Sequence, residues 1–317
     1  MRIFITGATG YIGRVVTERA LADGHAVCGL SRSEEGDSRL RTLGATPVRG
    51  ELASLEVLRQ QSAQADAVLH LAYIHDFTMD HEEVLSIDAA AVDALGEPLR
   101  GTGKSFVITS GTAVVDPDPT GAETTEESPL SETFVLKDRI RSERHALRQS
   151  EDGVRVSAIR LPPYVYGRGS SYFVPMLMQM AAKAGESVYV DDGRLRTSGV
   201  HVDDAASLYL LAVGKAKAGD VFNGTGSTTV TLRQLAEAIG AALEVPVRSV
   251  SREEAEAIWG KFLTAFVQFE NRASNRKAVQ QLEWRPKGID MLTDIRSGSY
   301  RELAEKFRQT KHPAYVG

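Results

Sequence analysis

The sequence has one cysteine, no long apolar run and no block of charge of one sign. Cys28 alone cannot form an internal disulfide or a cysteine-rich metal site, which is typical of a reducing compartment, so we expect a cytoplasmic protein. No apolar run approaches the ~20 residues that span a bilayer, and the first residues show no leader pattern. The net charge of −5 is evenly spread, so neither nucleic acid nor a membrane is an expected partner.

The 317 residues, with 42% hydrophobic and 25% charged side chains, have the composition of an ordinary globular protein. Disordered, collagen-like and coiled-coil classes are excluded. The length allows one large domain or a domain with a smaller appendage.

Apolar segments recur at spacings that leave room for a helix between them, which is the signature of βαβ units. The continuously apolar stretches 67–69 and 105–108 indicate strands covered by helices on both faces. We therefore predict an α/β fold with a doubly wound parallel (Rossmann) sheet. The predicted strands are 2–6, 25–31, 46–49, 66–72, 104–110 and 154–160.

The pattern changes after residue 161, where Pro and Gly punctuate shorter segments. Helices are predicted over 231–243, with Thr231 as N-cap, and over 252–263. We expect a dinucleotide-binding domain at 1–165 and a smaller, interleaved C-terminal substrate lobe at 166–317. Segments within about 195–225 should return to the sheet domain.

The strongest local motif joins the first strand to the first helix. Its glycines are Gly7, Gly10 and Gly13, with Thr9, Tyr11 and Ile12 between them. A pyrophosphate at such a turn needs free backbone N–H groups and no Cβ in its way, and the helix N-terminus adds positive potential. Because the motif lies first in the chain and between a strand and a helix, it predicts a dinucleotide site.

The end of the second strand indicates which dinucleotide binds. A carboxylate there would hold an adenosine ribose 2′-hydroxyl, whereas an arginine accommodates a 2′-phosphate. This strand ends at Ser31-Arg32, with no acid before Glu34. Arg32 and Ser31 therefore favour NADP (NADPH) over NAD; the alternative is a solvated surface arginine.

With these residues in place, the chain resembles the extended short-chain dehydrogenase/reductase family, of the NAD(P)-dependent epimerase/dehydratase type. The motifs that carry the resemblance are 7–13, 70–72, 109–111, 160–167, 201–204, 221–223 and 284–286. The resemblance implies the Rossmann fold, a small-molecule substrate and a homodimer. It also implies cofactor contacts at Leu71, Ala72 and Tyr73 and at Leu161, Pro162 and Pro163.

The family's members use a Ser/Thr, a Tyr and a Lys in a Y-x-x-x-K motif, supported by an Asn. Spacing read back from Glu143 places Arg139 at the lysine and Val135 at the tyrosine, and a register from Lys137 gives Thr133 instead. No tyrosine occurs between Tyr73 and Tyr164, so no register restores the motif. The resemblance therefore implies an atypical subgroup with a degraded tetrad.

Six residues are candidates for the catalytic groups: Ser110, Thr112, Arg139, Asp88, His75 and Tyr164. Ser110 and Thr112 follow the fifth strand and bind either a substrate oxygen or local backbone. Arg139 is an electrostatic group or part of a solvated basic helix face. His75 has the right chemistry for proton transfer, although isolated histidines are mostly structural.

Two of the six candidates have a packing role as their alternative. Asp88, at the Asn position, is either a buried, neutral acid or a surface carboxylate. Tyr164 either replaces the missing phenol or packs in the core. His201 and Asp203 lack further ligands at metal-binding spacing, so we predict no metal site.

The run 172–180 is rich in aromatic residues and methionine, and with Trp259, Phe262, Phe266 and Phe269 it would line an apolar cleft. We therefore expect an NADP-dependent oxidoreductase that acts on a small, fairly apolar carbonyl or imine compound. The alternatives are a catalytically silent NADP-binding sensor or scaffold, and a sugar epimerase or dehydratase, which would need a proton shuttle at the missing tyrosine.

Overall fold

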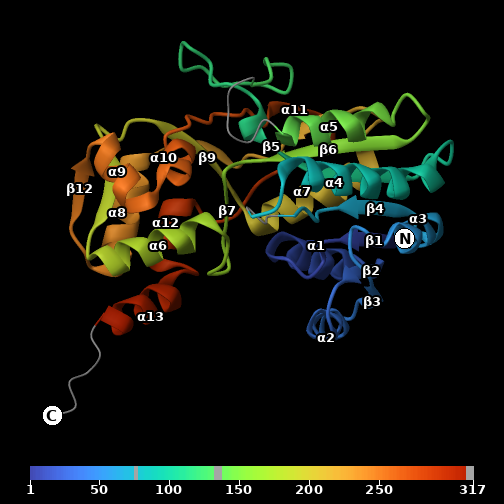
Figure 1. The fold of residues 1–317 in the computed structure, drawn as a ribbon, viewed down its shortest axis with the longest axis horizontal. Helices are drawn as coiled ribbons and strands as arrows, with labels where there is room; N and C mark the ends of the chain where they lie inside the picture. The colour runs from blue at the N-terminus through green and yellow to red at the C-terminus, as the bar shows by residue number, and fades with distance from the viewer. Residues whose placement is uncertain (75–77, 132–137, 312–317) are drawn as a thin grey trace.

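The computed structural model describes residues 1–74, 78–131 and 138–311 (Figure 1). Its centre is a seven-stranded sheet in the order β10-β6-β5-β4-β1-β2-β3, and all of its strand pairs are parallel. The strands of this sheet are β1 (Arg2–Thr6), β2 (Ala26–Ser31), β3 (Thr46–Arg49), β4 (Ala67–His70), β5 (Ser105–Gly111), β6 (Arg155–Leu161) and β10 (Val221–Asn223). This is the predicted Rossmann sheet, whose strand order reverses between β1 and β4.

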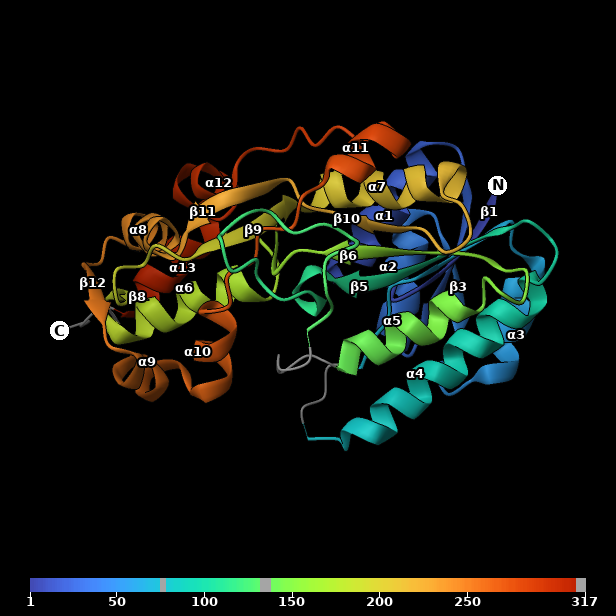
Figure 2. The same ribbon diagram turned by 90° about the horizontal axis from the view of Figure 1, so that it is seen from above.

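Helices cover both faces of the sheet (Figure 2). They are α1 (Tyr11–Ala22), α2 (Glu34–Leu43), α3 (Leu55–Gln64), α4 (His81–Gly96), α5 (Asp138–Arg148), α7 (Val202–Lys215) and α11 (Arg276–Leu282). Helices α1 and α7 pack on one face, and α3, α4 and α5 pack on the other.

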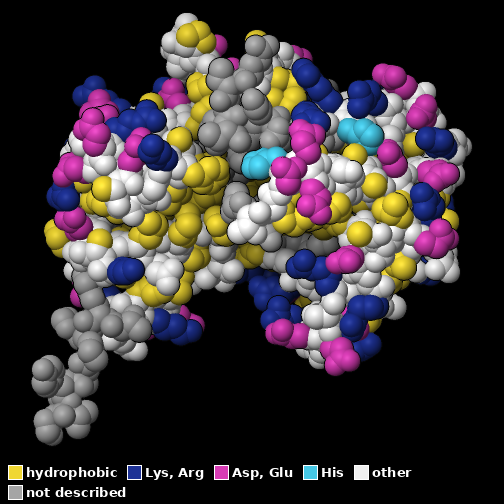
Figure 3. Space-filling model, viewed as in Figure 1, with side chains coloured by type: hydrophobic (Ala, Val, Ile, Leu, Met, Phe, Trp, Pro, Cys, Tyr) yellow, Lys and Arg dark blue, Asp and Glu magenta, His cyan; other side chains and the backbone are white. Residues whose placement is uncertain are grey.

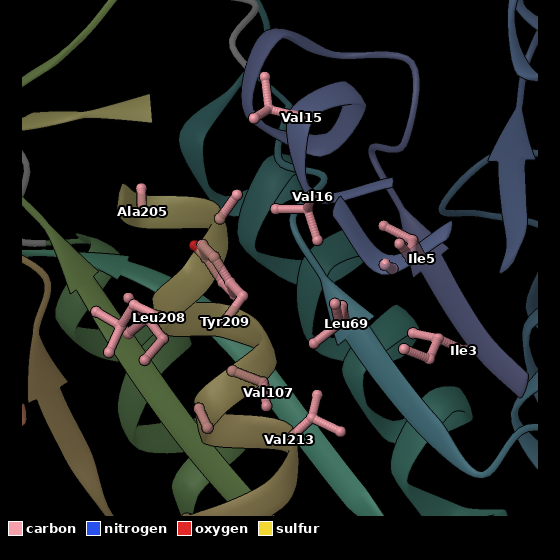
Figure 4. Close-up of a cluster of buried hydrophobic side chains, with 14 of the residues drawn as sticks. Ile3, Ile5, Val15, Val16, Leu69, Val107, Ala205, Leu208, Tyr209 and Val213 are labelled. Atoms are coloured by element: carbon pink, nitrogen blue, oxygen red, sulfur yellow. The ribbon is translucent and has the colours of Figure 1, made fainter. Parts of the chain in front are cut away.

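Alternate side chains of each strand enter the two hydrophobic cores. Ile3 and Ile5 belong to the core between the sheet and helices α1 and α7 (Figure 4). Phe4 belongs to the core on the other face, under α3 and α4. Because both faces are buried, the strands are continuously apolar, as the sequence indicated.

The remaining elements form a second lobe, which lies beside the sheet domain (Figure 1). Its strands are β7 (Tyr164–Tyr166), β8 (Ser187–Val190), β9 (Arg196–His201), β11 (Ser227–Thr231) and β12 (Val247–Val250). Its helices are α6 (Phe173–Ala184), α8 (Leu232–Leu243), α9 (Arg252–Trp259), α10 (Lys261–Val267), α12 (Met291–Ser297) and α13 (Arg301–Lys311). One hydrophobic core joins α6, α8, α10 and α12.

Two predicted helices of this lobe have different outcomes. The helix after Thr231 is confirmed, and Thr231 caps it in a reciprocal capping box with Gln234. The prediction of a single helix over 252–263 is wrong. Helix α9 ends at Trp259, Gly260 adopts a φ of +79°, and a new helix begins at Lys261. Among the described residues, no helix is long and apolar enough to cross a membrane.

Candidate functional site

The predicted cofactor residues gather at the edge of the sheet where its parallel strands end. Thr6, Ser31, His70, Gly111 and Leu161 are the last residues of β1, β2, β4, β5 and β6. In doubly wound sheets, ligands bind outside this edge at the point where the strand order reverses. Here that point is the crevice between β1 and β4.

The glycine loop between β1 and α1 is built without room for side chains. A Cβ on Gly7, whose φ is +72°, would lie 2.7 Å from the Ala72 nitrogen, and one on Gly13 would lie 2.0 Å from the Gly7 oxygen. Gly10 caps α1 without a side-chain hydrogen bond, and a Cβ there would meet only the Gly7 oxygen, at 3.2 Å. Because Gly10 is exposed and no side chain caps α1, the N–H groups of the helix N-terminus are left for a ligand, which fits a dinucleotide pyrophosphate.

The end of β2 presents one unpaired cation. Arg32 is exposed and makes no hydrogen bond or ion pair within the part of the chain that the structure describes. The Ser31 hydroxyl is buried and donates to the Ser33 carbonyl at 3.0 Å, and Ser33 caps α2. The loop is thus held by its own hydrogen bonds, while the Arg32 guanidinium remains available to an anion.

A buried polar chain connects the glycine loop to α4. The Thr6 hydroxyl and His70 Nδ1 lie 2.7 Å apart, and His70 Nε2 lies 3.5 Å from Asp88 Oδ1. The Ala72 N–H donates to the same Thr6 hydroxyl at 3.3 Å. These contacts turn Leu71 and Ala72 out of β4 and toward the glycine loop, so β4 ends two residues earlier than predicted.

Asp88 is buried and hydrogen-bonded, as one of the two alternatives predicted, but its charge differs from the neutral state that this alternative assigned to it. The residue is 5% exposed, so it is not a surface carboxylate. Burial raises the pKa of a carboxyl, but the His70 hydrogen bond and the charges of His70 and Arg139 outweigh burial and hold the pKa of Asp88 below its ordinary value. Asp88 is therefore ionised near neutral pH, not a neutral hydrogen-bonding acid.

Arg139 reaches the strand ends from the first turn of α5. Its guanidinium stacks over the Tyr73 ring, 3.8 Å from the ring centroid, and donates to the Thr109 carbonyl at 2.8 Å. The contact with β5 and with the segment after β4 excludes the solvated-face alternative for this arginine. Four other residues of the sequence argument, His75, Thr133, Val135 and Lys137, lie outside the described residues.

The two hydroxyl candidates after β5 have different surroundings. The Thr112 hydroxyl is buried and donates to Asn271 Oδ1 at 2.9 Å. The Ser110 hydroxyl is equally buried but has no hydrogen-bond partner in the described structure. A buried polar group without a partner is uncommon in folded proteins, so the Ser110 hydroxyl stands out among the buried groups of this edge.

Tyr164 follows the 161–163 segment and is buried in the core of the second lobe. Burial raises the pKa of its phenol well above the ordinary value, which makes the group a poor proton donor. Its hydroxyl has no partner in the described structure. Of the two alternatives for Tyr164, the packing role fits this environment better.

Several contacts of the site have no local signal in the sequence. Asn271 lies 159 positions from its partner Thr112, and Tyr209 of α7 lies 2.7 Å from the Thr109 hydroxyl. Tyr11 of the glycine loop donates to the Gly167 carbonyl at 2.8 Å, which ties the loop to the second lobe. Among the described residues, no group of His, Cys, Asp or Glu is placed to hold a metal ion.

Comparisons with known proteins agree with this geometry. Residues 3–223 match the model of the NAD dependent epimerase/dehydratase family. The chain is 39% identical to Uncharacterized protein C2A9.02 of Schizosaccharomyces pombe, over 95% of this chain and 100% of that protein. It is 29% identical to a 4-hydroxy-2-methyl-3-oxo-4-farnesyl-3,4-dihydroquinoline-1-oxide ketoreductase of Stigmatella aurantiaca, over 74% of this chain and 70% of that protein.

Among solved structures, the fold is similar to a Thermus thermophilus UDP-glucose 4-epimerase in complex with NAD. The TM-score is 0.72 at 20% identity, over 97% of this chain and 99% of that chain. The family match covers more than half of the sequence and includes the glycine loop and all strands of the central sheet. The chain therefore belongs to the NAD-dependent epimerase/dehydratase family of extended short-chain dehydrogenases/reductases, whose members bind a nicotinamide cofactor.

Proposed function

We propose that the protein is an NADP-dependent oxidoreductase that acts on a small, fairly apolar carbonyl or imine compound. The observation that carries the proposal is that three features lie at one edge of the sheet. They are the glycine loop, the Ser110 hydroxyl without a partner in the described structure, and the Arg139 guanidinium that donates to the Thr109 carbonyl. We also propose that it acts in the cytoplasm, with residues 1–165 holding the cofactor and much of 166–317 holding the substrate.

The cofactor would be held by residues from four strand ends. They are Gly7, Thr9, Gly10, Tyr11, Ile12 and Gly13 at the pyrophosphate, Ser31 and Arg32 at the 2′-phosphate, and Leu71, Ala72, Tyr73, Leu161, Pro162 and Pro163 toward the nicotinamide. When bound, the nicotinamide supplies or accepts the hydride. The unpaired state of Arg32 supports NADP, whereas the Thermus thermophilus structural neighbour holds NAD.

The chain's own groups would orient the substrate and stabilise charge. The Ser110 hydroxyl would donate to the substrate oxygen, because it has no other partner. Arg139, always protonated, would stabilise negative charge on that oxygen or hold the cofactor ribose, but it cannot supply a proton. His75 stays a candidate proton donor on its chemistry alone, because it lies outside the described residues.

Hydride transfer is favoured over epimerisation and dehydration for a chemical reason. Those reactions need a proton shuttle at the tyrosine position, where the spacing from Glu143 places Val135. The name of the Stigmatella aurantiaca relative, a ketoreductase, supports reduction of a ketone. The lack of a tyrosine between Tyr73 and Tyr164 equally supports a catalytically silent NADP-binding sensor. An experiment has to separate the oxidoreductase from this sensor.

The test measures NADPH and NADH binding to the purified protein by calorimetry and follows oxidation of each cofactor with a panel of ketones, aldehydes and imines. Turnover of NADPH with an apolar carbonyl compound, and its loss in Ser110→Ala, is the expected result. Tight NADPH binding without turnover of any compound would establish the sensor instead.

A further inference from the structure

A chain of buried polar groups leads from helix α4 to the cofactor crevice. Asp88 Oδ1 lies 3.5 Å from His70 Nε2, and His70 Nδ1 lies 2.7 Å from the Thr6 hydroxyl. The Ala72 N–H donates to the same hydroxyl at 3.3 Å. Asp88, His70 and Thr6 are all buried, so water does not compete for these contacts. We call these four residues the Asp88 chain.

A carboxylate at the buried end of this chain is unusual. Figure 3 shows Asp and Glu side chains at the surface of the sheet domain, in contact with solvent. Asp88 lies beneath that surface, and an ionised carboxylate is costly to bury unless it is hydrogen-bonded. Burial raises the pKa of Asp88, but the hydrogen bond from His70, together with the charges of His70 and Arg139, outweighs burial and lowers this pKa. The fold therefore keeps a charged acceptor at this end of the chain.

An ionised carboxylate only accepts hydrogen bonds, so it sets the direction of the Asp88 chain. His70 Nε2 must carry the hydrogen of the contact with Asp88. In the neutral imidazole, Nδ1 then has a lone pair, which accepts the hydrogen of the Thr6 hydroxyl. The Thr6 oxygen is left to accept the Ala72 N–H. All three hydrogen bonds therefore point toward Asp88.

The outer end of the Asp88 chain forms a wall of the cofactor crevice. A Cβ on Gly7 would lie 2.7 Å from the Ala72 nitrogen and 2.9 Å from the Leu71 carbonyl carbon. The Leu71 N–H also donates to the Thr6 carbonyl at 3.2 Å. Segment 71–72 therefore lies directly against the glycine loop, with no room for a side chain between them. A shift of Ala72 would change the surface that a dinucleotide meets there.

We propose that Asp88 is a positioning residue for the nicotinamide cofactor, and that it acts through His70 and Thr6 on the Ala72 wall of the crevice. It does not contact the substrate. The inference rests on the proposed cofactor contacts of Leu71 and Ala72, but not on the proposed reaction. Its effect differs from that of the 2′-phosphate site, because segment 71–72 meets a part of the dinucleotide that NADPH and NADH share.

The test measures the Kd of NADPH and of NADH by calorimetry, without substrate. Thr6→Val keeps the size of the side chain but removes the hydroxyl, so both cofactors should bind about 3- to 10-fold more weakly. Thr6→Ser keeps the hydroxyl and should bind both cofactors like the wild type. The control is Thr17→Val in α1, where the hydroxyl is also buried but has no partner in the described structure, so both Kd values should stay unchanged.

A double-mutant cycle tests whether Asp88 acts through Thr6. Asp88→Asn has nearly the same shape, but its amide can donate as well as accept, so it no longer sets the direction of the chain. It should weaken the binding of both cofactors by about 2- to 5-fold. Because Thr6→Val has already broken the chain, the double variant should bind like Thr6→Val alone. Losses that multiply in the double variant would overturn the proposed action through Thr6.

The outcomes separate this role from stability and from the proposed reaction. Urea denaturation shows whether each variant is folded under the assay conditions. Variants that lose stability but bind both cofactors as tightly as the wild type would contradict the positioning role. A loss for NADPH alone would contradict it as well, since such a loss points to the 2′-phosphate. Equal losses for both cofactors support the role, even if no carbonyl compound is turned over and the oxidoreductase proposal fails.

Discussion

Arg160 of β6 and Glu143 of α5 form a buried, two-pronged ion pair. Nε of Arg160 lies 2.9 Å from one carboxylate oxygen, and a second guanidinium nitrogen lies 2.5 Å from the other. Both side chains are nearly inaccessible to solvent. The pair fixes α5 against the sheet, and with it the register that brings Arg139 to the strand ends.

The first prediction concerns the stability of this pair. Glu143→Leu leaves the Arg160 charge buried and unpaired, which should reduce the free energy of unfolding by about 3–5 kcal/mol. Urea denaturation measures the change. Glu82→Leu serves as the control. Glu82 lies on α4 and is the exposed partner of Arg141, so this variant should lose much less unfolding free energy. Equal losses in the two variants would contradict the structural role of Glu143.

The second prediction separates the two hydroxyls after β5. Thr112→Val leaves Asn271 Oδ1 without its donor and should destabilise the protein by about 1–3 kcal/mol. Ser110→Ala removes no hydrogen bond within the described structure, so stability should change little while kcat/KM falls about 10- to 100-fold. Thermal denaturation and steady-state kinetics give the two readouts, and unchanged kinetics in Ser110→Ala would remove Ser110 from the site.

The third prediction concerns Arg139, whose guanidinium joins Tyr73 to β5. Arg139→Ala removes the positive charge near the substrate oxygen and should lower kcat by about 100- to 1000-fold. Arg139→Lys keeps the charge but loses the planar stack, so partial recovery is expected. Arg144→Ala, on the exposed side of α5, is the control. If the lysine variant were no better than the alanine variant, charge would not be the function of Arg139.

The sequence predicted the sheet and the position of the glycine loop well, because both follow from local patterns. Helix-length spacing between apolar runs identified the six predicted strands within a few residues of their observed bounds. The break at Gly260 was missed, since one glycine in a helical pattern is often tolerated.

The pairwise contacts of the site could not be predicted in the same way. Asn271 and Thr112 meet only because the second lobe folds back over the end of β5. The ionised state of Asp88 depends on His70 and Arg139, which come from two other elements. Neither periodicity nor motif spacing carries information about such contacts.

The fourth prediction is a pH dependence of stability that arises from Asp88. Its pKa is lower in the folded protein than the value of about 3.9 for an unfolded chain, so the folded state binds fewer protons. The ionised carboxylate therefore stabilises the fold above that value, and the stabilisation is lost as the pH falls through the lower, folded-state pKa.

Urea denaturation between about pH 6 and about pH 3 measures this effect. Asp88→Asn should show a smaller fall in the free energy of unfolding over the acid part of this range than the wild-type protein. Glu83→Gln, at an exposed position of α4, should retain the wild-type dependence. The same acid dependence in Asp88→Asn and in the wild type would show that Asp88 is not held ionised.

The most direct test of the account is the affinity of the wild-type protein and of Arg32→Ala for NADPH and NADH, measured by calorimetry. The account predicts that the wild type prefers NADPH, and that Arg32→Ala weakens NADPH binding by about 10- to 100-fold with little effect on NADH. Arg39→Ala, on the following helix α2 and paired with Glu35, should behave like the wild type. The account would be contradicted if the wild-type protein bound NADH as tightly as NADPH, or if it bound neither cofactor.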